Sequence, residues 1–216
     1  MDNLIETMTF FLGKAICHQI PERTFLANGQ YMPICARCTG IYLGVFFSLL
    51  YLAVTKRFRS NTIPSVKISF FLLLFLLPLV VDGFGSYLGF YSTTNLIRVM
   101  TGVMFGVTLP IFVVPLANRS TQLNRRVISN LWSFLATIII ASILAILTSL
   151  GLIPFVILNT LIIGVMISWV ALLFFLFFKK MKNNYYAISI SYVCSIMILA
   201  ALSSLHSYVE SIIDIV

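Results

Sequence analysis

The sequence predicts an all-α integral membrane protein: a polytopic bundle of about six transmembrane helices, preceded by a short N-terminal interfacial helix. Hydrophobic residues make up 60% of the 216 residues and charged residues only 9%, and the mean hydropathy is +1.06. Water-soluble domains carry far more charge. In addition, apolar runs of about 20 residues, the length that crosses the hydrocarbon core as a helix, recur along the chain.

Six stretches have the length and hydropathy of membrane spans. We expect them at residues 36–55, 67–82, 96–117, 128–149, 153–178 and 185–207. The apolar segment 4–16 is too short to cross, so it should lie at the interface or pack against the bundle. We therefore expect one membrane domain over residues 1–216, with a Cys/His segment at 1–35 and a six-helix bundle at 36–207.

Stripes of small residues indicate close helix packing in two of these spans. Gly40, Gly44 and Ser48 recur at four-residue spacing in the first span, and Gly102 and Gly106 do so in the third. Small residues at this spacing let two helix backbones approach closely. Nothing about such a stripe requires a substrate, so the structural interpretation is favoured.

Loop charges predict the orientation of the spans. Lysine and arginine collect after the first, third and fifth spans, which places these loops in the cytoplasm by the positive-inside rule. These basic residues are Lys56, Arg57, Arg59, Lys67, Arg119, Arg125, Arg126, Lys179, Lys180 and Lys182. The N-terminal segment, and the C-terminus with Glu210 and Asp214, are then expected on the extracytoplasmic face of a cell membrane.

The same loop residues account for the net charge of +8. That charge therefore does not indicate a nucleic-acid partner. The lipid bilayer is the partner that the sequence implies, and a small-molecule or protein partner is left open.

Three of the four cysteines lie close to a histidine, as Cys17-His18 and Cys35-x-x-Cys38. Two cysteines three residues apart, where a loop enters a helix, can share an ion or form a disulfide. Together with Cys17 and His18 they form a set of three cysteines and one histidine spaced like a zinc module, and thiolate with imidazole favours zinc. Adjacent helical residues point about 100° apart, so Cys17 and His18 bind one ion only where the backbone turns, as Pro21 favours.

The role of this set has several interpretations. A closed site of four ligands is structural, and would staple the N-terminal segment to the first helix; this is the favoured interpretation. The fourth position could also go to His206 or to water, and with water there the metal could be catalytic, so enzyme activity is left open. The alternative is a membrane thiol-disulfide oxidoreductase that uses Cys35 and Cys38, because Arg37 beside them stabilises a thiolate.

A second polar group lies at the predicted outer end of the second and third spans. Asp82 ends the second span, and Asn95 and Arg98 begin the third. Charges near membrane depth are costly unless paired, so Asp82 and Arg98 are expected to meet across the outer hairpin. With Arg37 and His206 these residues would form one outer polar pocket. A small transporter or permease, with Asp82 and Arg98 as its polar path, is a further alternative.

Two strings in the first half of the chain resemble a known family. The first runs Cys17-His18-Gln19-Ile20-Pro21-Glu22-Arg23-Thr24-Phe25 and resumes as Pro33-Ile34-Cys35-Ala36-Arg37-Cys38-Thr39-Gly40-Ile41-Tyr42-Leu43-Gly44. The second comprises Asp82-Gly83, Ser92 to Asn95, Arg98, Thr101 and Gly102. Both are similar to the uncharacterised prokaryotic membrane-protein family called domain of unknown function 2085. The resemblance implies a small polytopic membrane protein and supplies no activity.

Overall fold

The computed structural model describes residues 2–27, 29–118, 126–128, 131–181 and 183–213. Within these residues six helical segments are long and apolar enough to cross a membrane, which confirms the predicted all-α polytopic bundle. The segments are Ala36–Val54, Val66–Tyr87, Asn95–Ala117, Leu131–Ser149, Phe155–Phe178 and Asn184–Ile212.

Some of the residues that predict the orientation lie outside the described part of the chain. These are Arg119, Arg125, Lys182 and Asp214. The orientation of the spans therefore stays a prediction. The described chain divides into two compact units, Met1–Cys35 with Gly151–Val216 and Ala36–Leu150, and each is described by itself. The single membrane domain expected over residues 1–216 also stays a prediction.

The unit of residues 36–150 is built around helices α2 (Ala36–Val54) and α5 (Asn95–Ala117), which form its most extensive helix contact. The two glycine stripes face each other along this contact. A methyl group built on Gly44 would lie 2.6 Å from the carbonyl oxygen of Val103. One built on Gly106 would overlap the carbonyl group of Ile41. The close backbone approach expected of small residues is thus confirmed.

The second span consists of two helices, α3 (Val66–Leu74) and α4 (Leu77–Tyr87). The break falls just before Pro78, which fits the first turn of α4 because its missing N–H would have no helical partner there. The span ends at Tyr87, not at residue 82 as predicted. Asp82 therefore lies inside helix α4. Helix α6 (Leu131–Ser149) packs on α2 and α5.

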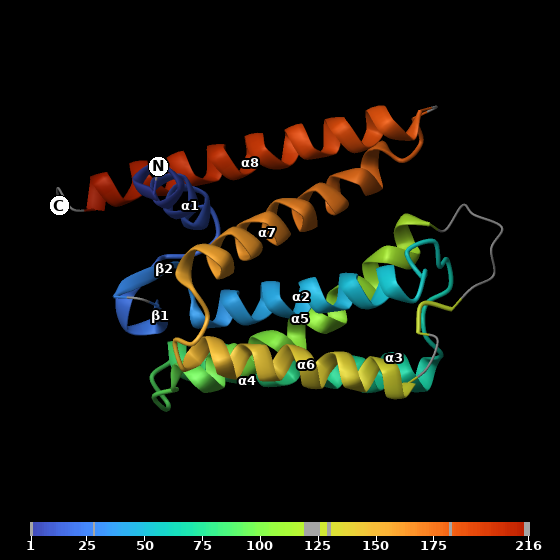
Figure 1. Cartoon of the computed structure of the whole chain (residues 1–216), viewed down its shortest axis with the longest axis horizontal. Coiled ribbons are helices and arrows are strands. Elements are labelled where there is room, and N and C mark those ends of the chain that lie inside the picture. The colour runs from blue at the N-terminus through green and yellow to red at the C-terminus, as the bar shows by residue number, and fades with distance from the viewer. Residues whose placement is uncertain (1, 28, 119–125, 129–130, 182, 214–216) are drawn as a thin grey trace. The chain divides into compact units, whose positions relative to one another are not determined.

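The other unit combines the N-terminal segment with helices α7 (Phe155–Phe178) and α8 (Asn184–Ile213), which run side by side (Figure 1). Helix α1 (Asp2–Lys14) packs against both. Asn159 of α7 donates a hydrogen bond to Thr9 Oγ1 at 2.8 Å, and Ser203 of α8 donates one to the Phe11 carbonyl at 2.5 Å. Of the two places expected for segment 4–16, the structure thus shows packing against neighbouring helices.

A β-hairpin follows α1 and was not expected from the sequence. After a short 3-10 helix, η1 (Pro21–Arg23), strand β1 (Thr24–Ala27) pairs antiparallel with β2 (Gln30–Cys35). The signal that could have found it is the dipeptide Asn28-Gly29 between two short apolar runs, a common hairpin turn. Strand β2 leads into α2 without an intervening residue.

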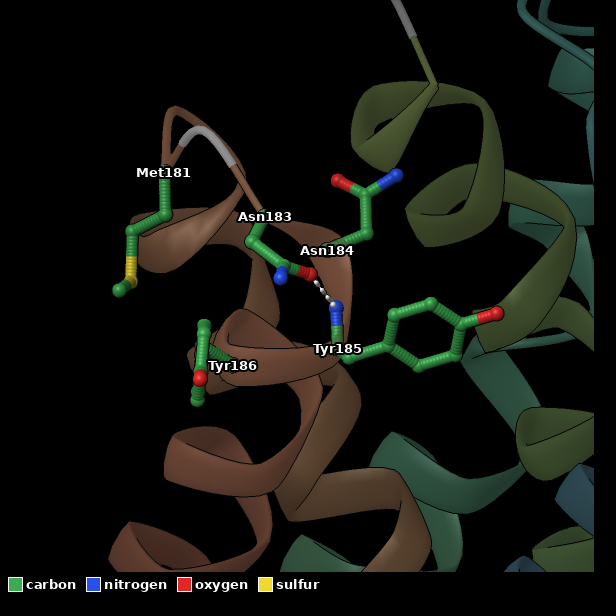
Figure 2. A pocket seen from close by; sticks show the side chains of 5 residues that line it. All are labelled: Met181, Asn183, Asn184, Tyr185 and Tyr186. Carbon is green, nitrogen blue, oxygen red and sulfur yellow. Dashed lines mark hydrogen bonds between the residues drawn. The ribbon is translucent and has the colours of Figure 1, made fainter.

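The turn between α7 and α8 lines a pocket of about 670 Å³ with Met181, Asn183, Asn184, Tyr185 and Tyr186 (Figure 2). The side-chain oxygen of Asn183 accepts the backbone N–H of Tyr185 at 2.9 Å, which satisfies one N–H at the start of α8. The residues that line it offer amide and phenol groups, but no thiol, imidazole or carboxylate. Tyrosines at a helix end are typical of the membrane interface, so we assign this pocket no chemistry.

Candidate metal centre

The Cys-x-x-Cys pair lies where strand β2 becomes helix α2. Cys35 is the last residue of β2, and Cys38 is the third residue of α2. Because three residues make nearly one helical turn, the two side chains reach the same side of the chain. Both are half-buried. Their separation depends only on this local backbone.

Cys17 reaches this pair because the segment after α1 is fastened to β2. Gly13 lies against the carbonyl group of Pro33 so closely that a side chain there would overlap it. Gln19 then turns the chain with φ of 53° and donates from its side-chain amide to the carbonyls of Phe10 and Pro33, at 2.8 Å each. The sequence gives no signal for this role of Gln19, since any amide side chain can bridge two carbonyls.

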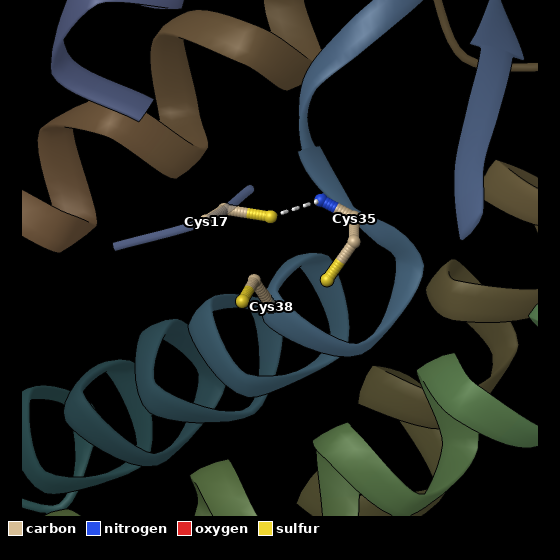
Figure 3. Close-up of side chains that lie close together, drawn as sticks. All are labelled: Cys17, Cys35 and Cys38. Carbon is tan, nitrogen blue, oxygen red and sulfur yellow. Dashed lines mark hydrogen bonds between the residues drawn. The ribbon is translucent and has the colours of Figure 1, made fainter. Parts of the chain in front are cut away.

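The sulfur atoms of Cys17, Cys35 and Cys38 all lie within 4.8 Å of one another. Figure 3 shows the Cys17 side chain directed at the backbone nitrogen of Cys35, whose N–H donates to the Cys17 sulfur at 3.1 Å. A hydrogen bond to sulfur favours the charged thiolate, which is the form that binds metal. Cys17 is buried, with 6% of its surface exposed. The donor set therefore suits a thiophilic ion.

His18 is not among the ligand atoms that the structure gathers with these sulfurs. Its side chain is exposed, and its ring meets that of His206 edge-on, with ring centroids 5.1 Å apart. The physical reason is that Cys17 and His18 are adjacent, so a buried sulfur leaves the imidazole facing another way. In the described residues the three cysteines of the predicted set are assembled, and His18 lies with His206.

Asp82 is bound by Arg37, whereas the sequence favoured Arg98 as its ion-pair partner. The Arg37 guanidinium donates to Asp82 Oδ2 from Nε at 3.1 Å and also from Nη2, which reaches the Asp82 carbonyl oxygen at 3.4 Å. The Asp82 side chain is 3% exposed. Helix α4 continues past this carboxylate because Arg37 of α2 neutralises it, which explains why the predicted end of the span was wrong.

Arg98, the partner predicted for Asp82, donates from Nη1 to Asn95 Oδ1 at 3.0 Å, within the first turns of α5. Arg98 is largely buried, with 8% of its surface exposed. Arg37, Asp82, Asn95 and Arg98 thus all lie in the unit of residues 36–150. The outer pocket that would join them to His206 stays a prediction.

Comparisons with known proteins agree with this picture. The family model described as "Predicted membrane protein (DUF2085)" matches residues 17–112. An uncharacterised protein of Methanothermobacter thermautotrophicus is 38% identical over 97 residues, which are 44% of this chain and 82% of that protein. An uncharacterised protein of Methanocaldococcus jannaschii is 35% identical over 101 residues, 47% of this chain and 63% of that protein. No solved structure matches the chain.

The region that the family model matches begins at Cys17 and runs into α5. It therefore contains all three clustered cysteines and the pair of Arg37 with Asp82. The chain belongs to the DUF2085 family of predicted membrane proteins.

Proposed function

We propose that this integral membrane protein holds a zinc ion at Cys17, Cys35 and Cys38, and that the ion has a structural role. The observation that carries the proposal is the convergence of the three sulfurs within 4.8 Å. Three thiolates around a tetrahedral zinc ion, at about 2.3 Å each, lie about 3.8 Å apart. Each sulfur–sulfur separation therefore has to shorten by at most about 1 Å, a movement of about 0.6 Å per sulfur, to complete the geometry.

Two features favour a structural role over a catalytic one. Cys17 is buried, and Gln19 and Gly13 hold the backbone around it by direct contacts with β2. An ion at this point would join the segment after α1 to the Cys-x-x-Cys motif and replace side-chain packing that so short a segment cannot supply. A fourth ligand would complete the tetrahedral coordination. The positive charges of the loops support an extracytoplasmic location for the centre.

We expect the protein purified in detergent, without chelators, to contain at least about one zinc per chain by elemental analysis. The double variant Cys35→Ser, Cys38→Ser should contain about one zinc per chain fewer, because two oxygen donors replace two thiolates. The matched control is Cys194→Ser, since Cys194 lies in α8 and outside the cluster. This control should keep the zinc.

The reactivity of the cysteine thiols distinguishes bound zinc from a disulfide. In the zinc-bound protein, alkylation of Cys17, Cys35 and Cys38 should be slow until a chelator is added, because coordination blocks the sulfurs. A metal-free protein with a reducible disulfide between Cys35 and Cys38 would overturn the zinc proposal and favour the thiol-disulfide oxidoreductase. Tryptic mapping with and without reductant separates the two results.

A further inference from the structure

A second group of metal-ligating side chains, which begins at the residue after Cys17, lies where the segment after α1 contacts α8. His18, His206 and Glu210 line a pocket there of about 360 Å³. Its other walls are the apolar side chains of Ala15, Leu202, Leu205 and Val209. The proposed zinc centre uses neither His206 nor Glu210, so it gives these two side chains no role.

The three polar side chains are already close to one another. His206 Nε2 lies 3.1 Å from Glu210 Oε1, and the two residues are four apart on α8, so they share one face of the helix. The His18 ring stands at 72° to the His206 ring. His18 is exposed, so its side chain can turn without disturbing a packed core.

We infer that His18, His206 and Glu210 form a second metal site, for a divalent transition-metal ion. Two imidazoles and one carboxylate suit zinc, iron(II) and cobalt(II), which take mixed nitrogen and oxygen donors in open sites. The other side chains that line the pocket are apolar, so His18, His206 and Glu210 are its side-chain donors. In this arrangement His18 serves the second site and is not a ligand of the ion at the sulfurs.

The Lys14 ammonium group would compete with a metal ion for the Glu210 carboxylate. This group lies 2.5 Å from Glu210 Oε2, where it holds the carboxylate by charge. A metal cation at Glu210 would repel that ammonium group and displace it, because two positive charges cannot share the carboxylate at this distance. Removing the charge at position 14 should therefore strengthen metal binding, whereas removing a ligand should weaken it. A merely structural ion pair would not produce this opposite pair of effects.

The test is titration of the full-length protein with Co²⁺ alone, in the Cys35→Ser, Cys38→Ser background, where two of the three thiolates of the sulfur centre are removed. We expect about one Co²⁺ per chain, with the weak absorption of nitrogen and oxygen ligands and no sulfur-to-cobalt charge-transfer band. His206→Ala and Glu210→Gln should each weaken binding at least about tenfold. Lys14→Gln should strengthen it, and Glu22→Gln, a change at an exposed carboxylate of η1, should leave it unchanged.

Any of three results would overturn the inference. The first is no Co²⁺ binding in the cysteine-substituted background, and the second is a Co²⁺ affinity of Glu210→Gln equal to that of the background. The third is a shift of the sulfur-to-cobalt band when His18→Ala is made in the otherwise native chain. The last result would assign His18 to the sulfurs. Glu210 is exposed enough, at 41% of its side chain, for its substitution to leave folding intact. The zinc content of His206→Ala with all cysteines present reports binding at the sulfur centre alone.

Discussion

The variant Gly106→Val is expected to lower the free energy of unfolding by about 3 kcal/mol, because the new side chain would be forced into the backbone of the neighbouring helix. A Cβ at position 106 would already overlap the carbonyl group of Ile41. A carbonyl cannot rotate away as a side chain can, so α2 and α5 must separate along their whole contact. The midpoint of thermal or SDS-induced unfolding in detergent micelles measures the loss.

Gly164→Val is the matched control. Gly164 also lies in a membrane helix, α7, but a Cβ there would meet no atom within 4 Å. The intrinsic cost of valine in a helix is the same in both variants, so the difference between them reports the contact of α2 with α5. Equal loss of stability in Gly106→Val and Gly164→Val would show that this contact does not hold the unit together.

Arg37→Ala should destabilise the protein by about 3 to 5 kcal/mol, because it leaves the Asp82 carboxylate buried without its cation. Only 2% of the Asp82 surface is exposed, and Oδ1 is already buried without a hydrogen-bond partner among the described residues. The double variant Arg37→Ala, Asp82→Ala should recover much of the loss, since it removes both charges. Unfolding midpoints of the two single variants and the double variant form the cycle that isolates the coupling.

The exposed residue Lys67 supplies the control for this cycle. Lys67→Ala removes a basic side chain from α3, in the same unit as Arg37, and should change stability by less than about 0.5 kcal/mol. If the double variant is as unstable as the sum of the two single variants, the pair contributes no coupling. Asp82 would then be stabilised by other groups in its surroundings.

The membrane spans and the approach of Cys35 to Cys38 could be predicted from the sequence because both depend on local signals. Hydropathy reports lipid exposure directly, and Cys35 and Cys38 are only three residues apart. The spacing of a zinc module also predicted that Cys17 would join them, but the contacts of Gly13 and Gln19 that bring it there have no such signal. The close approach of a helix backbone at each glycine stripe follows from residue size, whereas the helix that each stripe contacts does not.

The features that could not be predicted depend on contacts between distant segments. Asp82 has two arginines available, Arg37 and Arg98, and hydropathy cannot choose between them. Ending the second span at this carboxylate was reasonable for an unpaired charge and wrong for a paired one. The hairpin of β1 with β2 was missed because four to six residues give too short a pattern. The direction of the His18 ring depends on the turn at Gln19, and no residue in this segment predicts that turn.

The length of α8 has a consequence for how ions could reach the chain. Its 30 residues make a rod of about 45 Å, whereas the hydrocarbon core of a bilayer is about 30 Å thick. Tyr185 and Tyr186 lie at its first turn and suit the headgroup layer on one side. Counted from Tyr185, His206 lies about 32 Å along the axis, at the far edge of the hydrocarbon, and Glu210 about 38 Å along it, in the opposite headgroup layer. Water reaches the headgroup layer, so an ion would meet Glu210 before it had lost its water shell.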